Sequence, residues 1–230
     1  MTQLELFEEN NLDETITPAD FFQAETDGYF CTLPDLSGLY ELSVDAFFAA
    51  LFARMSCLPI AAELSRFIEK VKKAGNRAAS DRIAGDMGDP DVFAVTKAAG
   101  KVQKEIHRLT GLLRFEPDSA GMYTARCSPD HFTLPALAEH FTIRFGEIPW
   151  VIIDEKRGIC LSRQDDRPAK LVKQTPVPAL GLPAEKNSSW EELWRLYHQS
   201  VSNDARKNLR LQRQFIPERY QKYLPEMRSL

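Results

Sequence analysis

The sequence lacks the features that would place the chain in a membrane or around a metal. A membrane-spanning helix needs about 20 consecutive apolar residues, and no apolar run here approaches that length. Only four cysteines are present (Cys31, Cys57, Cys127 and Cys160), and none of them forms a C-x-x-C pair. Isolated cysteines of this kind are more often small buried side chains than metal ligands. We therefore expect no membrane segment, no metal site and no cofactor.

The best-known catalytic motifs are also missing. The sequence contains no G-x-S-x-G, no P-loop, no G-x-G-x-x-G and no H-E-x-x-H. Many hydrolases, P-loop NTPases, dinucleotide-dependent enzymes and zinc proteases are built on these motifs. The sequence therefore gives no direct indication of an enzyme class.

Positive charge is absent from the first part of the chain. Residues 1–45 contain eleven Asp and Glu and no Lys or Arg, whereas the remaining 185 residues carry 29 basic and 22 acidic side chains. An acidic start ahead of a basic body indicates that the body meets an anionic partner, although acidic termini also serve solubility alone. The beginning of the chain lacks the basic and apolar stretches of a secretory signal, so we expect a cytoplasmic protein.

Hydrophobic periodicity predicts a helix-rich α+β fold. Four helices are expected, at residues 44–55, 59–75, 76–86 and 91–109. The period then changes to two, so that residues 112–127 and 150–162 each form a β-hairpin, with a helix at residues 134–145 between them. We therefore expect a small antiparallel sheet of two hairpins packed against helices, followed by a C-terminal helical segment.

Composition divides the chain into four parts. Residues 1–38 are acidic and interrupted by Pro and Gly, which predicts a flexible N-terminal extension. Residues 39–173 form the α+β domain, and residues 174–189 form a Pro/Gly-rich connector. Residues 190–230 are predicted to form a helical segment that packs on the domain.

The predicted helix at residues 91–109 is the most informative. Its apolar residues fall on one face at about 100° per residue: Val95, Ala99, Val102, Ile106 and Leu109. Four cations fall on the opposite face: Lys97, Lys101, Lys104 and Arg108. An exposed helix face usually mixes both signs, because like charges four residues apart destabilise a helix. These cations indicate contact with a phosphate backbone, and an ordinary solvated face is the alternative.

The C-terminal segment mixes basic, aromatic and amide side chains. Arg and Lys bind phosphates, Tyr stacks on bases, and Asn or Gln reaches base edges. The candidate DNA-binding residues of this segment are Arg206, Asn208, Arg210, Gln212, Arg213, Arg219, Tyr220 and Lys222. The same composition also suits a helix whose long side chains lie along its own domain.

A few residues are candidates for catalysis. Asp130 and Asp154, with Lys156 close behind, resemble the metal-binding carboxylates and the lysine of PD-(D/E)xK nucleases, in which two carboxylates hold Mg²⁺. The pattern is short, and Lys156 falls in a predicted turn. His107 and His131 could act as acid or base, although a buried or capping histidine is the more frequent case.

Four segments together resemble one protein family. They are HRLTGLLRF (107–115), SPDHFTLPALAEHFTIRF (128–145), WVIIDEKRG (150–158) and RKNLRLQRQFIPERYQKYL (206–224). Residues 40–225 resemble an uncharacterised family of DNA metabolism or repair proteins. Members of that family are associated with a radical-SAM protein of DNA modification or repair, and some are fused to a uracil-DNA-glycosylase-like domain. The resemblance adds Arg157, which occupies a motif position, to the catalytic candidates.

The other motif positions carried by the resemblance are His107, Arg114, His131, Trp150, Asp154, Asn208, Arg210, Gln212, Arg213, Pro217, Arg219 and Tyr220. Two places depart from the family pattern. Tyr40-Glu41-Leu42-Ser43-Val44 stands where family members have a Tyr-Asp-Gly-Ser-Phe type of segment, and Gln221 replaces a Trp after the Arg-Tyr pair. The missing indole would weaken a stacking or packing contact at this end.

The chain begins MTQLELFEENN, with three large apolar side chains in a polar run. Gln3-Leu4-Glu5-Leu6-Phe7 resembles the bacterial sliding-clamp-binding peptide, Gln-Leu-(Ser/Asp)-Leu-Phe. In such a peptide Leu6 and Phe7 would fill an apolar cleft, and Gln3 would form a hydrogen bond at its edge. The alternative is a segment that packs on its own domain.

These observations predict a DNA-binding accessory protein of DNA repair or modification. The expected partners are DNA, the radical-SAM protein and the bacterial sliding clamp. The first alternative is a DNA-processing enzyme that uses His107, His131, Asp130, Asp154 or Arg157, and the second is a pure protein–protein adaptor.

Overall fold

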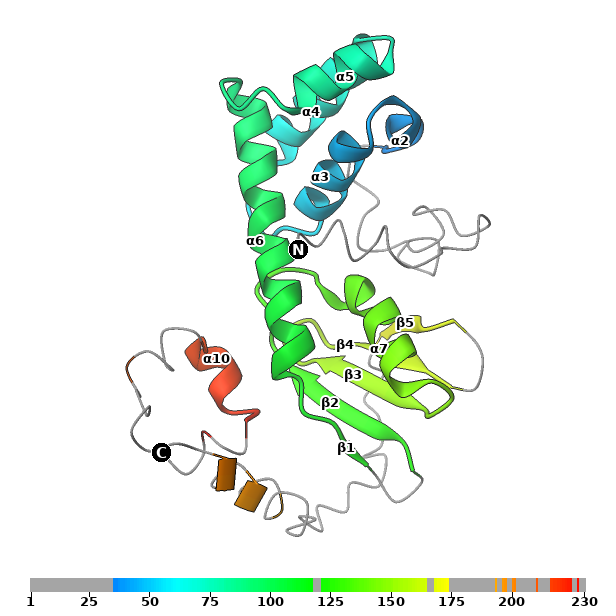
Figure 1. The fold of residues 1–230 in the computed structure, drawn as a ribbon, viewed down its shortest axis with the longest axis vertical. Coiled ribbons are helices and arrows are strands. Elements are labelled where there is room, and N and C mark those ends of the chain that lie inside the picture. The colour runs from blue at the N-terminus through cyan, green and yellow to red at the C-terminus, as the bar shows by residue number, and fades with distance from the viewer. Residues whose placement is uncertain are drawn as a thin grey trace.

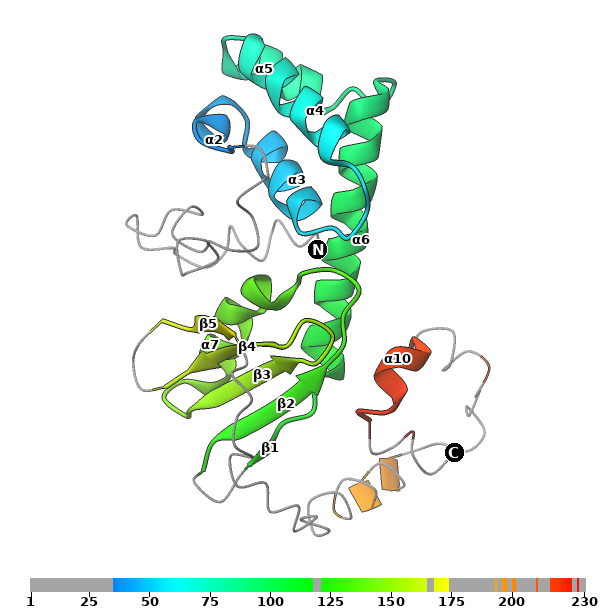
Figure 2. The same cartoon turned by 180° about the vertical axis from the view of Figure 1, so that it is seen from behind.

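A helical half and a sheet half are joined by one long helix (Figure 1, Figure 2). The computed structural model describes residues 35–117, 121–164, 168–173 and 216–224, with positions 193, 196–197, 200–201, 210 and 227. The helices are α2 (Leu39–Leu42), α3 (Val44–Arg54), α4 (Ala61–Lys73), α5 (Arg77–Ala84), α6 (Pro90–Leu112), η1 (Leu134–Leu137), α7 (Ala138–Phe145) and α10 (Glu218–Gln221). The strands are β1 (Glu116–Pro117), β2 (Tyr123–Cys127), β3 (Trp150–Asp154), β4 (Ile159–Arg163) and β5 (Lys170–Lys173).

Helix α6 is the expected amphipathic helix, and it extends over 23 residues. Its start is well defined, because the Asp89 carboxylate accepts hydrogen bonds from the N–H groups of Asp91 (2.8 Å) and Val92 (3.4 Å). Pro90 in the first turn favours the same start. All five predicted apolar positions are buried: Val95, Ala99, Val102, Ile106 and Leu109. Helices α3 and α4 pack against α6 (Figure 1).

The N-terminal end of α6 is held to α4 by charge. The buried carboxylate of Asp91 accepts hydrogen bonds from Arg66 (2.7 Å) and Lys70 (2.8 Å). These bonds lower the pKa of Asp91 to about 2, and the bond from Arg66 has the larger effect. The carboxylate is therefore ionised at neutral pH, and α6 is fixed at its first turn as well as along its apolar face.

The sheet contains the two predicted hairpins, joined by a parallel pair of strands. Strand β1 pairs with β2 and β3 pairs with β4 in antiparallel fashion, whereas β2 and β3 run parallel. Parallel neighbours need a crossover connection, and η1 with α7 forms it. Strand β5, which pairs with β4, and helix α2 were not predicted. The α+β class, the mostly antiparallel sheet and the C-terminal helix are confirmed.

Buried apolar side chains run continuously through both halves, including Phe67 of α4, Val102 of α6 and Trp150 of β3. Over the described residues, no helix has the length and hydrophobicity to span a bilayer. Of the predicted N-terminal extension only residues 35–38 are described, and the predicted connector, residues 174–189, lies outside the described residues.

Candidate functional site

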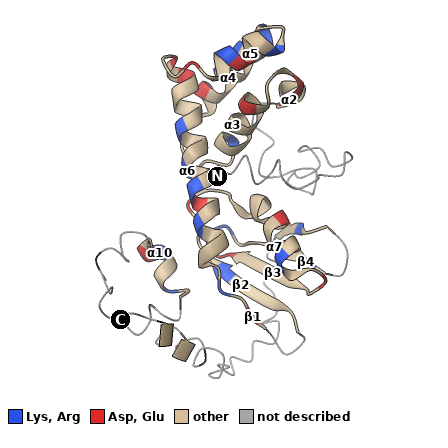
Figure 3. Cartoon of the chain, viewed as in Figure 1, with Lys and Arg blue, Asp and Glu red and all other residues tan. Residues whose placement is uncertain are grey.

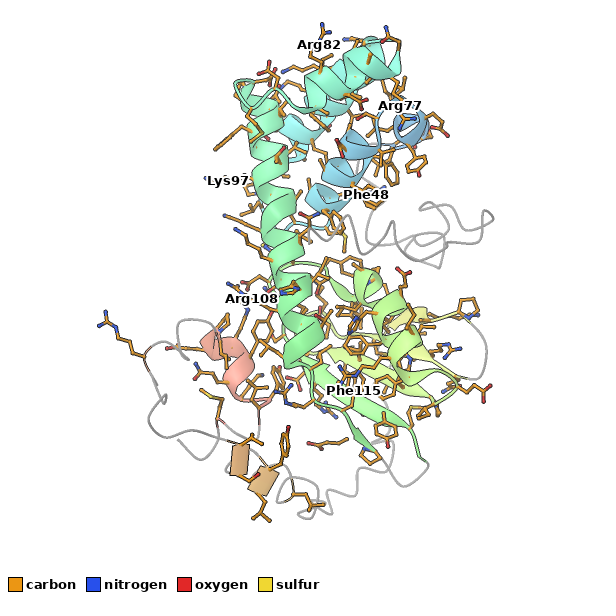
Figure 4. All side chains as sticks on the ribbon, viewed as in Figure 1. Phe48, Arg77, Arg82, Lys97, Arg108 and Phe115 are labelled. Atoms are coloured by element: carbon orange, nitrogen blue, oxygen red, sulfur yellow. The ribbon has the colours of Figure 1, made fainter. Side chains whose placement is uncertain are left out.

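The four cations of α6 lie together on its exposed face, and we call them the basic ridge: Lys97, Lys101, Lys104 and Arg108. Figure 3 shows basic positions repeated along α6, and Figure 4 shows Lys97 directed away from α3. In the part of the chain that the structure describes, no carboxylate pairs with any of the four. The ridge therefore presents positive charge that the described part of the chain does not neutralise.

Many cations elsewhere in the described residues have carboxylate partners. Examples are Arg66 and Lys70 with Asp91, Arg157 with Asp154, Arg219 with Glu105, and Lys222 with Glu155. Like charges on one helix face destabilise the helix slightly. The lack of any such ion pair for the four ridge cations in the described residues is therefore a feature that stability of the fold does not explain.

The buried face of the same helix carries an acid, Glu105, that is only 2% exposed. Its carboxylate accepts hydrogen bonds from the backbone N–H groups of Asp130 (3.0 Å) and His131 (2.7 Å). It also accepts from the Arg219 guanidinium (2.8 Å) and the Tyr220 hydroxyl (2.6 Å). One side chain thus joins α6 to the loop after β2 and to α10.

The surroundings of Glu105 favour its ionised form. Burial alone would raise the pKa of Glu105, but the hydrogen bonds from Tyr220, the two backbone N–H groups and Arg219 outweigh it and lower the pKa. Burial and the adjacent carboxylate both raise the pKa of Tyr220 above its ordinary value. At neutral pH the pair is therefore a carboxylate and a neutral hydroxyl that donates to it.

A signal for Glu105 was present in the sequence, and the prediction missed it. Glu105 lies three residues after Val102 and four before Leu109, on the margin of the apolar face. A carboxylate in that position is buried only when several donors satisfy it. Those donors come from segments distant in sequence, so their identity required the structure.

Asp154 and Arg157 lie near the residues that contact Glu105, but their hydrogen bonds hold the backbone of the β3–β4 turn and of the loop after β2. The Asp154 carboxylate is fully buried and accepts from the N–H groups of Lys156 (2.9 Å) and Arg157 (3.2 Å), which follow it in the β3–β4 turn. Its other oxygen accepts from the Arg157 guanidinium (2.7 Å). Arg157 in turn donates to the carbonyl oxygens of Pro129 (3.1 Å) and Asp130 (2.6 Å). Both residues therefore fix the loop that Glu105 holds from the other side.

The remaining catalytic candidates do not form one site. The buried His131 ring accepts a hydrogen bond at Nδ1 from the N–H of Cys57 (3.1 Å), so its neutral form carries the proton on Nε2. Burial lowers the pKa of His131, which favours this neutral form. His107 is exposed on α6, and Asp130 is half-exposed, paired with Arg219 at 2.8 Å. In the described residues, no group of three or more His, Cys, Asp or Glu side chains is placed to hold a metal ion.

The candidate residues of the C-terminal segment are only partly described. Tyr220 is buried, with Arg219 over its ring at 4.8 Å, so its position favours packing over stacking on a base. Lys222 pairs with Glu155 at 3.1 Å, and Arg210 is exposed. Arg206, Asn208, Gln212 and Arg213 lie outside the described residues, as do the clamp-peptide candidates Gln3, Leu4, Leu6 and Phe7.

Comparison with protein families places the chain in a family. A model for a domain of unknown function, DUF4130, matches residues 61–226, which is well over half of the chain. The chain belongs to the DUF4130 family. The match contains α6, the loop after β2, the β3–β4 turn and α10, and so includes every contact of Glu105 described above. Neither the curated proteins nor the solved structures gave a significant match.

Replacing Tyr220 by Phe tests how strongly Glu105 holds α10. The change removes a hydrogen bond to a buried charge, so we expect the free energy of unfolding to fall by about 1.5–3 kcal/mol. Urea denaturation followed by circular dichroism measures this loss.

Tyr223→Phe is the matched control, because the Tyr223 hydroxyl donates to the more exposed Glu155 at 2.6 Å. We expect that variant to lose less than about 1 kcal/mol. Equal losses in the two variants would show that Glu105 is not the stronger anchor of the C-terminal segment.

Proposed function

We propose that this protein is a DNA-binding accessory protein of DNA repair or modification, and that the basic ridge is its contact with the phosphate backbone. The observation that carries the proposal is the set of four cations on one helix face, none of which has a carboxylate partner among the described residues: Lys97, Lys101, Lys104 and Arg108. A polyanion supplies the countercharge that the described part of the chain does not.

The dimensions of the ridge suit a run of phosphates. At about 1.5 Å per residue, Lys97 and Arg108 lie about 16 Å apart along the helix. One strand of a DNA duplex carries a phosphate about every 3.4 Å of axis, so the ridge is as long as about five phosphates. Because α6 is capped, tied to α4 and buried along its opposite face, the cations need little ordering when they bind.

The contacts of the catalytic candidates Asp154 and His131 favour an accessory role over catalysis. A nuclease that held Mg²⁺ on Asp130 and Asp154 would first have to break the bonds of Asp154 to Arg157 and to the turn backbone. The Nδ1 atom of His131 is likewise occupied by a backbone N–H. These side chains position the loop after β2, and we assign them no chemical step.

The partners of the proposed function rest on sequence resemblance. The four family-like segments support an association with a radical-SAM protein of DNA modification or repair. The QLELF segment supports tethering to a bacterial sliding clamp, which would bring the protein to DNA in the cytoplasm. A short peptide of this kind binds through two or three apolar anchors and becomes ordered only on binding.

Removal of three ridge cations is the direct test of DNA binding. In Lys97→Ala with Lys101→Ala and Lys104→Ala, we expect weaker binding and a log-affinity against log-salt slope that is shallower by about two to three units. Fluorescence anisotropy with a labelled oligonucleotide at several salt concentrations measures both quantities.

The matched control removes the same charge from other helices. Arg77 and Arg82 of α5 and Arg144 of α7 are exposed, and no carboxylate partner is found for them among the described residues. The triple alanine variant of these residues should keep the wild-type slope. An unchanged slope in the ridge variant, or an equal change in the control, would favour the adaptor function instead.

A second test concerns the clamp. A synthetic peptide of residues 1–11 should bind a bacterial sliding clamp with micromolar dissociation, since roughly -8 kcal/mol is what a few buried apolar anchors leave after ordering costs. Leu6→Ala with Phe7→Ala should abolish this binding, because both anchors lose their buried area. Isothermal titration calorimetry measures the affinity.

The control is a peptide of residues 1–12 with Leu12→Ala, which removes a leucine outside the QLELF segment. It should bind the clamp as tightly as the unchanged peptide of residues 1–12. If no peptide binds, and if the Leu6 and Phe7 changes lower the melting temperature of the full chain, the segment packs on its own domain instead.

A further inference from the structure

An exposed phenylalanine lies at the N-terminal end of the basic ridge. Phe93 of α6 is 47% exposed, and the ammonium group of Lys97 lies 5.5 Å from the centre of its ring. Exposing an aromatic ring on the polar face of a helix does not contribute to the core. The exposed ring of Phe93 can stack against a planar group of a binding partner.

Gly100 lies on the same exposed side of α6, one helical turn before Lys104. A Cβ atom added at Gly100 would meet nothing within 4 Å, and the backbone there is helical. Glycine in a helix interior is less stable than alanine, and no neighbouring atom requires it. Gly100 therefore leaves a stretch of bare helix backbone with room for the close approach of another molecule.

Phe93, Gly100 and His107 form one stripe along α6. They are spaced by seven residues, which brings them to the same side of a helix with a drift of about 20° per step. The stripe runs along one flank of the basic ridge and spans about 21 Å. His107 is exposed, so an aromatic ring lies near each end of the stripe and the bare backbone of Gly100 lies between them.

We propose that α6 binds single-stranded DNA, with the phosphates on the basic ridge and the bases on the stripe of Phe93, Gly100 and His107. This inference rests on the proposed function and specifies its substrate. Bases of a single strand are open to stacking on aromatic rings, whereas those of a duplex are stacked on one another. A base can approach the helix backbone most closely at Gly100, where no side chain intervenes.

The test compares a labelled single-stranded oligo-dT with a duplex of equal length by fluorescence anisotropy. Wild-type protein should prefer the single strand, and Phe93→Ala should weaken single-strand binding about tenfold while leaving duplex binding unchanged. Ile143→Ala removes an apolar side chain that is 65% exposed on α7, and this control should change neither affinity.

Gly100→Ala separates binding from folding. The change should raise the melting temperature by about 2–4 °C, because alanine favours the helix and its Cβ has room. It should nevertheless weaken single-strand binding, since the added methyl group keeps the strand away from the backbone.

The outcomes distinguish this inference from the function on which it rests. If the ridge variant loses binding to both DNA forms but Phe93→Ala and Gly100→Ala lose neither, DNA binding stands and the single-strand inference is wrong. Equal losses on single strand and duplex would overturn it as well. If the ridge variant binds both forms like wild type, the proposed function itself fails.

Discussion

Glu105 is a buried charge on the helix that joins the two halves of the fold, and its four hydrogen-bond donors come from two other parts of the chain, the loop after β2 and α10. A buried carboxylate is costly unless its donors are all in place. Helix α6, the loop after β2 and α10 therefore stabilise one another through a single group. Loss of any of these donors would leave part of a buried charge unsatisfied.

The same helix has opposite electrostatic properties on its two sides. On the buried side the carboxylate of Glu105 is satisfied by amide, guanidinium and hydroxyl donors, and on the exposed side the ridge cations form no ion pair with the acidic side chains of the described residues. The first arrangement fixes the position of α6 in the fold. The second presents charge from a rigid support, so that binding of a polyanion requires little reorganisation of the protein.

Periodicity was sufficient to predict α6, because its buried and charged residues repeat with the helical period over the whole segment. Sequence also predicted the two hairpins, whose alternation is local. It did not predict the parallel pairing of β2 with β3, which depends on how η1 and α7 return the chain. Nor did it predict β5, because four residues are too short to show a clear alternation of polar and apolar side chains.

The candidate site was predictable only where it depended on one element. The basic ridge lies on a single helix, so its exposure followed from the helical pattern. The structural roles of Asp154, Arg157 and Tyr220 depend on contacts between distant segments, which residue type alone does not specify. Carboxylates, histidines and arginines suit catalysis and structural support equally well, and only their partners separate the two roles.

Photo-crosslinking tests most directly whether the exposed face of α6 is the DNA contact. A single-stranded oligonucleotide containing 4-thiothymidine would be bound to the full chain, irradiated, and the crosslinked peptides identified by mass spectrometry. We expect crosslinks within residues 93–108, including Phe93 at one end of the ridge. Crosslinks confined to other elements, such as α5 or β5, with none in α6, would contradict the account.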